Sequence, residues 1–276
     1  MKGTLFIVAT PIGNLDDITF RAVEILKGID IVLAEDTRHS QKLLKHLNIA
    51  KPIRAFHEHN EREKTKAIID ELHSGKSIAL ISDAGTPLIS DPGYFLVAQA
   101  KKEDLRVVPI PGASALITAL SASGLASDSF TFLGFLPSKK TARIKLLKTL
   151  LYQTKTSIFY ESPKRILATL TDMHAIFGSS REICLAKELT KVFETIRTDS
   201  IPNLIHYLNA DEKNQKGEFV ILISANDKID IVDAESRLDS LLTILCAEMG
   251  ASKAAKLAAK ITGVDKKICY KKAIDL

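Results

Sequence analysis

The sequence predicts an α/β protein with two α/β domains, 1–124 and 125–225, followed by a small basic helical region, 226–276. Two observations lead to this prediction. In the first region short apolar runs alternate with amphipathic stretches, which is typical of a parallel sheet covered by helices on both faces. In the second region strand candidates outnumber helix candidates, which favours a mixed sheet. Beyond Ala225 only helical patterns remain.

The first region alternates strand and helix candidates. The apolar runs that predict strands are residues 4–9, 29–36, 52–56, 77–82 and 106–110. Amphipathic stretches predict helices over 19–28, 37–48, 60–74 and 93–103. Thr19 is the expected N-cap of the first helix, and Gly28 is expected to end it.

The second region has five strand candidates and two helix candidates. The strand candidates are residues 130–135, 156–161, 182–188, 191–199 and 218–224. The helix candidates are 139–151 and 163–177. In the C-terminal region the patterns predict three helices, over 233–250, 252–263 and 264–274, with Gly250 and Gly263 ending the first two.

Composition and hydropathy favour a cytoplasmic protein without membrane contact. Apolar residues make up 46% of the 276 residues and charged residues 26%, which is typical of soluble globular proteins. No run approaches the ~18–20 apolar residues that a membrane span requires. Pro11 interrupts the N-terminal apolar stretch before a secretory signal could be complete.

Several common site types are absent from the sequence. Neither the dinucleotide fingerprint GxGxxG nor the phosphate-binding GxxxxGK[ST] occurs. The three cysteines lie far apart and form no CxxC pair. His57 and His59 are two residues apart, but no third ligand follows at a fixed spacing. We therefore expect no metal ion.

Positive charge is concentrated at the C-terminus. The whole chain carries a formal net charge of +5, and the segment 250–276 holds seven lysines against two aspartates. On a helix over 252–263, one face would carry the lysines Lys253, Lys256 and Lys260, and a second would carry Ala254, Leu257, Ala258 and Ile261. The second face is expected to pack on the preceding helix. The lysine face either contacts RNA phosphates or is a solvated surface.

Polar clusters follow each strand candidate of the first region. They are residues 10–14, 35–40, 57–60, 82–93 and 111–115. Each alone could be a turn or a cap; Thr37 or Ser114, for example, could cap the helix that follows it. Loops after parallel strands meet at one edge of the sheet, where α/β proteins bind their ligands. Together the five clusters predict a ligand-binding cleft.

Motifs along the whole chain resemble one enzyme family. They are, in order, VATPIGNLDDIT, AEDTRHSQKLL, HEHNE, SDAGTPLISDPG, VVPIPGASA, LSASGL, FLGFLPSKK, IFYESPKRI, AKELTKVFE and GEFVILI. In these motifs the chain is similar to the bacterial 16S rRNA (cytidine-2′-O)-methyltransferases, which belong to the tetrapyrrole-methylase-like class of S-adenosylmethionine-dependent enzymes. Ala113 stands where the family pattern has proline, which should change only the stiffness of that turn.

The resemblance implies a cofactor cleft between the two α/β domains, in which backbone groups of loops hold S-adenosylmethionine. Glycines in these loops allow close backbone approach, and Pro87 and Pro92 stiffen the loop 82–93. The implied cofactor contacts are Pro11, Ile12, Gly13, Asp83, Ala84, Gly85, Thr86, Ile89, Ser114, Ala115, Glu161 and Leu189.

Methyl transfer needs a group that aligns the acceptor oxygen and takes its proton. Polar side chains on the expected edge include Arg38 and Asn60, and the candidates for catalysis are Asp36, His57, Glu58 and Glu161. The sequence leaves open which of them is the base.

The resemblance also implies the partners. They are the 16S rRNA of the small ribosomal subunit, methylated in its decoding region, and a second copy of the chain in a homodimer. Candidate phosphate contacts outside the C-terminal region are Arg38, Lys139, Lys140, Arg143 and Lys164.

Two alternatives stay open. The same fold could methylate a small porphyrinoid, although TPIGN replaces the GPGD typical of those enzymes and a basic tail would serve no purpose there. The chain could instead be a non-catalytic ribosome-assembly factor, although this leaves the cofactor loops without a role.

Overall fold

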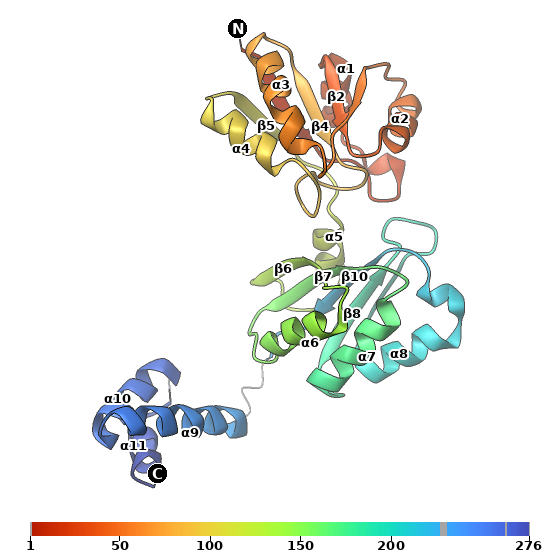
Figure 1. The fold of residues 1–276 in the computed structure, drawn as a ribbon. Helices are drawn as coiled ribbons and strands as arrows, with labels where there is room; N and C mark the ends of the chain where they lie inside the picture. Colours follow the sequence, from red (N-terminus) through yellow and green to blue (C-terminus); the bar gives the residue numbers. More distant parts are fainter. Residues whose placement is uncertain (1, 227–230, 263, 276) are drawn as a thin grey trace. The chain divides into compact units, whose positions relative to one another are not determined.

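The computed structural model describes residues 2–226, 231–262 and 264–275, with side chains in the second segment from residue 238 onward. The chain separates into two compact units, Met1–Ala225 and Asn226–Leu276 (Figure 1). The first unit contains two five-stranded sheets, and the second unit consists of helices.

The first sheet is parallel throughout. Its strand order is β3 (Ile53–Ala55), β2 (Ile31–Ala34), β4 (Ile78–Ile81), β1 (Thr4–Val8) and β5 (Arg106–Ile110). All four strand pairings are parallel. The strands β2 and β4 are buried at every position, because helices cover both faces of the sheet.

Four helices form the layers on the two faces of this sheet (Figure 1). They are α1 (Phe20–Gly28), α2 (Thr37–His46), α3 (Glu61–His73) and α4 (Tyr94–Lys102). Successive strand residues point to opposite faces. Leu33 accordingly packs in a core with residues of α3 and α4, whereas Val32 packs in a core with residues of α1 and α2.

The helix starts partly match the predicted caps. Thr19 caps α1 as expected, because its side chain accepts a backbone hydrogen bond in the first turn. The cap of α2 is Asp36 rather than Thr37, since its carboxylate accepts a hydrogen bond from the backbone of Arg38 at 2.8 Å. Ser114 precedes α5 (Ala115–Ala122) but makes no side-chain capping bond.

The second sheet is mixed, as expected. Its strand order is β6 (Phe130–Phe135), β7 (Thr156–Glu161), β10 (Phe219–Ile223), β8 (Glu182–Lys187) and β9 (Thr195–Ser200). Only the pair β6 and β7 is parallel, and the other three pairings are antiparallel.

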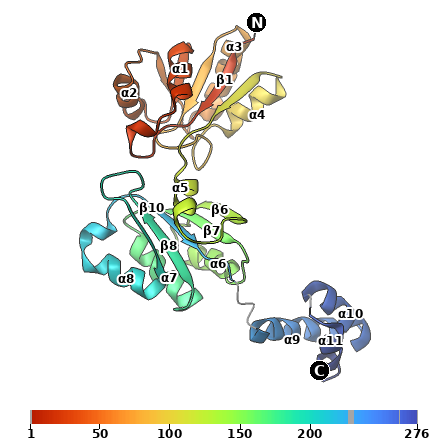
Figure 2. The ribbon, with the colours of Figure 1, turned by 180° about the vertical axis from the view of Figure 1, so that it is seen from behind.

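Helices also cover both faces of the second sheet. One face packs against α6 (Lys140–Thr149), α7 (Ile166–Phe177) and α8 (Ile201–Ala210), and α5 lies on the other face (Figure 2). The prediction of two helices in this region was therefore incomplete. It missed α8, which has Pro202 in its first turn, a position where proline is compatible with a helix.

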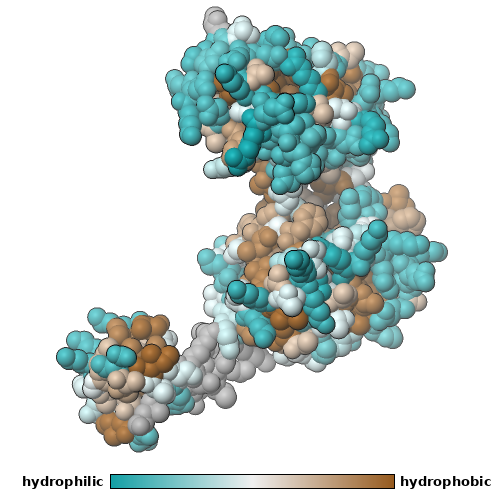
Figure 3. Space-filling view, viewed as in Figure 1, coloured by the Kyte–Doolittle hydropathy of each residue, from teal (hydrophilic) through white to brown (hydrophobic). Residues whose placement is uncertain are grey.

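The second unit consists of α9 (Ile231–Glu248), α10 (Ala251–Thr262) and α11 (Lys266–Ile274). The predicted packing face of α10 is partly wrong. Ala254 and Ala258 are fully buried together with Ala255, but Leu257 and Ile261 are 38% and 60% exposed. Small side chains let helices approach closely, which turns the alanine stripe inward. Figure 3 shows hydrophobic residues on the surface of this unit. Gly263, a predicted helix end, lies outside the described residues.

The described residues contain no membrane-spanning helix, no cluster of potential metal ligands and no disulfide. None of the described helices is both long and apolar enough to span a membrane. No group of three potential metal ligands occurs in the described part of the chain. The cysteines Cys184, Cys246 and Cys269 are free thiols.

Candidate active site

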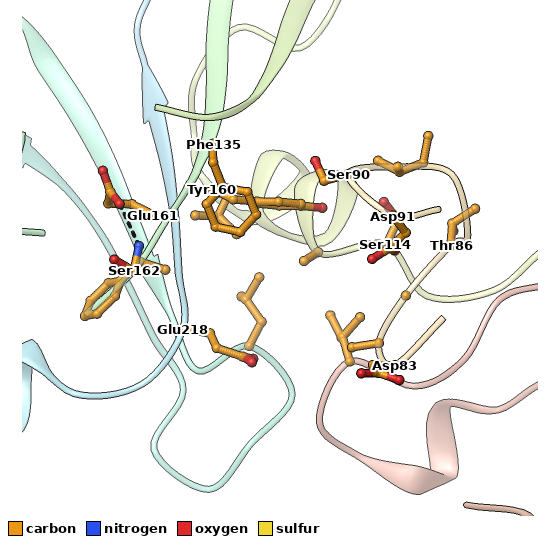
Figure 4. Close-up of a pocket in the computed structure, with 18 of the residues that line it drawn as sticks. Asp83, Thr86, Ser90, Asp91, Ser114, Phe135, Tyr160, Glu161, Ser162 and Glu218 are labelled. Carbon is orange, nitrogen blue, oxygen red and sulfur yellow. Dashed lines mark hydrogen bonds between the residues drawn. The ribbon is translucent and has the colours of Figure 1, made fainter. Parts of the chain in front are cut away.

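A cavity of about 430 Å³ lies in the first unit between the loops at the edge of the first sheet and strands of the second sheet (Figure 4). It brings together most of the residues predicted to contact a cofactor: Ile12, Asp83, Ala84, Gly85, Thr86, Ile89, Ser114, Ala115, Glu161 and Leu189. Pro11 and Gly13 do not line it. Gly13 lies against a loop of the second sheet, where a Cβ atom would be 2.8 Å from Thr190 Oγ1.

Sequence reasoning missed the other half of the lining. These residues are Glu35, Ser90, Asp91, Phe135, Tyr160, Ser162, Pro163, Glu218, Phe219 and Val220. Ser90 and Asp91 lie inside the loop 82–93, which the sequence did single out. Glu35 directly precedes the predicted Asp36, so that prediction was one residue away from the side chain that enters the cavity.

Hydrogen bonds to backbone carbonyls hold the loop 82–93 in shape and connect it to neighbouring loops. Thr10 and Gly85 form a two-way bridge, with N–O distances of 2.8 and 3.0 Å. Ser82 Oγ donates to the carbonyl of Gly85 at 2.8 Å, and Thr86 Oγ1 donates to the carbonyl of Ala113 at 3.1 Å. The backbone φ of Gly85 is +82°, a conformation in which glycine is favoured.

The second half of this loop adopts unusual backbone conformations. Leu88 and Ser90 have φ values of +72° and +67°, and Gly93 has +130°. Left-handed non-glycine residues persist where surrounding structure fixes them. Glu61 of α3 anchors the end of this loop, because its buried Oε1 atom accepts hydrogen bonds from the backbone of Gly93 at 3.1 Å and of Phe95 at 2.8 Å.

A β-bulge shapes the opposite wall of the cavity. The register between β6 and β7 shifts between Phe132 and Phe135, and Gly134 there has a φ of +67°. The ring of Phe135 lies 5.6 Å from that of Tyr160 in an edge-to-face contact. A Cβ atom on Gly134 would be 3.5 Å from Ser90 Oγ, so the bulge meets the loop 82–93. Bulges commonly redirect side chains near binding sites.

Three carboxylates line the first wall: Glu35, Asp83 and Asp91. Burial raises the pKa of Asp91 to about 7, and the charges of Glu35 and Asp83 add to the effect. Burial and Asp83 also raise the pKa of Glu35. Among the described residues, no hydrogen bond reaches the carboxylate of Asp91 or of Glu35. A pKa of about 7 means that Asp91 is present in both its protonated and its ionised form at neutral pH.

The carboxylate of Glu161, a predicted catalytic and cofactor-binding residue, is buried and hydrogen-bonded to three other groups. Its side chain is 0% exposed. Its carboxylate accepts hydrogen bonds from Arg165 Nε at 2.8 Å and Thr169 Oγ1 at 2.8 Å. It also accepts one from the backbone of Ser162 at 2.7 Å (Figure 4). This arrangement fixes the end of β7 to the start of α7 and argues against Glu161 as a proton acceptor.

The other predicted catalytic residues lie outside the cavity lining. Hydrogen bonds from Arg38 lower the pKa of the exposed Asp36 to about 2, which suits a helix cap better than a base. His57 Nε2 lies 2.9 Å from Asn60 Nδ2, and Glu58 is exposed. The structure therefore does not bring Asp36, His57 or Glu58 into the cavity.

The predicted phosphate contacts are placed unevenly. Arg143 is buried and donates two hydrogen bonds to Asp172 Oδ2, at 2.9 and 2.6 Å, so it is not available to RNA. Lys139, Lys140 and Lys164 are exposed. In the second unit the three lysines of α10 are exposed: Lys253, Lys256 and Lys260. The side chain of Arg38 is 88% exposed.

Comparison with known proteins decides the family. Residues 4–205 match the family model described as Tetrapyrrole (Corrin/Porphyrin) Methylases. The chain belongs to this family. Residues 232–276 match a model described as the RsmI C-terminal HTH domain. The match to the methylase family bears out the predicted fold class and the prediction of a methyltransferase that uses S-adenosylmethionine. It also disfavours the non-catalytic alternative.

Curated relatives match along nearly the full chain. A ribosomal RNA small subunit methyltransferase I from Pseudomonas aeruginosa is 50% identical over 275 residues, covering 99% of this chain and 97% of the relative. A protein of the same name from Haemophilus influenzae is 49% identical over 271 residues, covering 98% and 96%.

Solved structures with the same fold are more distant. The cobalt precorrin-4 methyltransferase CbiF has a TM-score of 0.60 at 17% identity, with 80% of this chain and 94% of that chain covered. A uroporphyrin-III-C-methyltransferase from Thermus thermophilus has a TM-score of 0.55 at 15% identity, covering 82% and 93%. At these identities the likeness shows the fold alone.

The cavity suits S-adenosylmethionine chemically. The donor carries positive charge on its sulfur and its amino group, and the first wall offers three carboxylates. The donor's adenosine part needs apolar and aromatic surface, which Ile12, Leu189, Phe135 and Tyr160 provide. A volume of about 430 Å³ falls in the range of small-molecule sites.

Proposed function

We propose that this protein transfers a methyl group from S-adenosylmethionine to the 2′-hydroxyl of a cytidine in 16S rRNA, within the decoding region of the small ribosomal subunit. The observation that carries the proposal is the match to enzymes named ribosomal RNA small subunit methyltransferase I, at 50% identity over 99% of this chain. The match includes the basic C-terminal helices, which a porphyrinoid substrate would not need.

The protein's part in the reaction is to bind and orient the donor and the acceptor and to take up a proton. When bound, the donor supplies a methyl group on a positively charged sulfur. The carboxyl groups of Glu35, Asp83 and Asp91 line one wall, and the rings of Phe135 and Tyr160 provide a flat surface on the other. Holding the acceptor oxygen in line with the methyl group contributes much of the rate in such displacements.

Exposed lysines supply candidate contacts for the rRNA backbone. Lys164 is exposed and directly follows Pro163, which lines the cavity. Lys139 and Arg38 are also exposed. Phosphate contacts of this kind position RNA without reading its sequence.

We further infer that the protein acts as a homodimer in the cytoplasm. The dimer is supported by the family resemblance, and the location by the rRNA substrate. Light scattering at micromolar concentration should give twice the mass of the chain, and a monomer mass would contradict the dimer.

The direct test of the function supplies labelled S-adenosylmethionine together with purified small ribosomal subunits, free 16S rRNA or a porphyrinogen. We expect label in the 16S rRNA of the subunit, recovered after nuclease digestion as 2′-O-methylcytidine. Thr86→Arg, which places a long charged side chain in the cavity, should abolish donor binding in calorimetry. Label in the porphyrinogen alone would establish the alternative substrate.

A second experiment tests the role of the C-terminal helices. Replacing Lys253, Lys256 and Lys260 by Gln should weaken subunit binding and flatten its dependence on salt over ~50–200 mM. Donor affinity should stay unchanged. The matched control replaces three exposed lysines of α3 and α4, namely Lys66, Lys101 and Lys102. Equal effects in both variants would show that only total charge matters, and no effect in either would leave the tail lysines as a solvated surface.

A further inference from the structure

We propose that Asp91 is the catalytic base that takes the proton of the ribose hydroxyl. The proposal rests on the proposed function, because it assigns a residue to that reaction. It replaces the four catalytic candidates that the sequence suggested with a residue of the cavity itself. Asp91 lines the cavity, has no hydrogen-bond partner among the described residues and lies near other acidic groups.

The fold presents Asp91 to the cavity from a rigid segment. It follows Ser90, whose backbone is left-handed, and precedes Gly93, whose N–H is held by the buried Glu61. Ser90 Oγ also lies close to the bulge at Gly134 on the opposite wall. A base must be held within hydrogen-bonding reach of its substrate, and this anchoring on both sides of Asp91 provides such a position.

The other carboxylates of the cavity are engaged or peripheral. Glu161 is buried under three donors. Glu218 is 74% exposed and pairs with Lys191 at 2.8 Å. Asp83 Oδ1 accepts a hydrogen bond from the backbone of Asp36 at 3.1 Å. These three groups therefore have partners, whereas Asp91 has none among the described residues.

Glu35 also lacks a hydrogen bond, but its surroundings differ. The groups that act on its charge, besides Asp83, are His57 and Glu58, which lie outside the cavity. The charge of Asp91 instead acts on a residue of the opposite wall. Burial raises the pKa of Tyr160, and the charge of Asp91 raises it further. Figure 4 shows Asp91 on the loop of the first wall and Tyr160 on the strand of the second. A ligand between the two walls would therefore meet both residues.

The charges around Asp91 poise it for proton transfer near neutral pH. The groups facing it are Glu35 after β2, Asp83 on its own loop and Tyr160 on β7, and Glu61 of α3 lies at the start of the following helix. A pKa of about 7 is close to the optimum for a general base working at neutral pH.

The step that we assign is a direct displacement. The hydroxyl oxygen forms the new C–O bond with one electron pair while its proton passes to a carboxylate oxygen of Asp91. The C–S bond breaks with its pair remaining on sulfur, so a neutral thioether leaves. The carboxyl proton then returns to solvent, which restores the base.

The first test compares Asp91→Asn and Asp91→Glu with the wild type on small ribosomal subunits. We expect Asp91→Asn to lower kcat by about 10²–10⁴-fold and to change donor affinity in calorimetry less than threefold. Asp91→Glu, which keeps the carboxyl group, should recover part of the rate. The control Asp104→Asn removes an exposed carboxylate whose left-handed backbone, with a φ of +52°, asparagine tolerates.

Other outcomes would overturn the proposal. A higher KM or Kd for the donor with an unchanged kcat would mean that Asp91 only attracts the positive donor. A wild-type kcat in Asp91→Asn would exclude it as the base. Failure of the proposed function is distinct, because the wild type itself would then leave the rRNA unlabelled.

The second test uses the pH dependence of kcat/KM. With a pKa of about 7, Asp91 is ionised in about one molecule in ten at pH 6, so the wild-type rate there should be about one tenth of its plateau. Glu35→Gln removes a negative charge that raises this pKa, so its acid limb should move to lower pH. An acid limb that does not move would contradict the assignment.

Discussion

The two walls of the cavity carry similar acidic side chains in opposite settings. On the second-sheet wall Glu161 and Glu218 each pair with a cation, Arg165 at 2.6 Å and Lys191 at 2.8 Å. On the first-sheet wall no described residue forms a salt bridge with Glu35, Asp83 or Asp91, and burial raises the pKa of Asp91 to about 7. The difference separates structural support from proton transfer: the buried pair at Glu161 stabilises the fold, and Asp91, which has no cation partner among the described residues, can exchange a proton near neutral pH.

Backbone strain, in contrast, occurs on both walls. The first wall contains the left-handed residues Leu88 and Ser90 within one loop, and on the second wall the left-handed residues Glu188 and Thr190 flank the cavity residue Leu189. Strain and unpaired charge both cost stability, and both occur where ligands are handled.

The largest expected effect comes from breaking the buried pair of the second wall. Arg165→Met leaves the carboxylate of Glu161, which is 0% exposed, without its cation. We expect a loss of about 3 kcal/mol in the free energy of unfolding, because an unpaired buried charge is costly. Urea unfolding followed by circular dichroism measures it. An unchanged transition would mean that this pair does not hold the wall.

A smaller loss of stability is expected from a substitution that strains the backbone of the loop 82–93 on the first wall. Gly93 has a φ of +130°, and a Cβ atom there would lie 2.6 Å from a methyl group of Leu80 and 2.9 Å from one of Leu88. Gly93→Ala should cost about 1–3 kcal/mol and weaken donor binding in calorimetry. Wild-type donor affinity in the destabilised variant would show that the loop geometry does not shape the site.

Asp91→Asn should increase stability, in contrast to the two changes above. The pKa of Asp91 is raised from 3.8 to about 7, so the folded state binds the extra proton and the wild type loses stability as pH rises from about 4 to about 7. The variant lacks this penalty. Because the group is partly exposed, we expect a melting temperature only about 2–4 °C above wild type at pH 8 and a smaller difference at pH 5. A larger gain at pH 5 would contradict the sign.

The smallest effect is expected at the exposed pair of the second wall. Lys191→Met removes the cation beside Glu218, which is 74% exposed. Surface pairs contribute about 0–1 kcal/mol, so urea unfolding should change little. A loss as large as that in Arg165→Met would show that burial does not set the value of these pairs.

Much of the fold follows from local patterns in the sequence. The predicted strands 106–110, 130–135 and 156–161 agree with the structure at both ends, because apolar runs bounded by turn residues define them. The helix α8 was missed since its apolar residues are interrupted by Pro202 and polar side chains. The buried face of α10 was misplaced because packing selected the alanines over Leu257 and Ile261.

The sequence predicted which loops form the site but not which of its side chains lack partners. Motif resemblance located the backbone that lines the cavity, including Gly85 and Thr86. It could not identify Glu35 and Asp91 as the unpaired carboxylates, because their properties depend on burial and on each other across 56 residues of sequence. The support of the loop by Glu61 is equally non-local.

The most direct test of the division between the walls is the titration of Asp91 in the free protein. Carbon-13 NMR of the carboxyl groups, with Asp91 assigned by the signal missing in Asp91→Asn, reports its pKa without donor or RNA. We predict a pKa of about 7, and a lower one in Glu35→Gln. A wild-type value near 3.8, the ordinary one for aspartate, would show that the first wall carries no poised carboxyl group and would contradict the account.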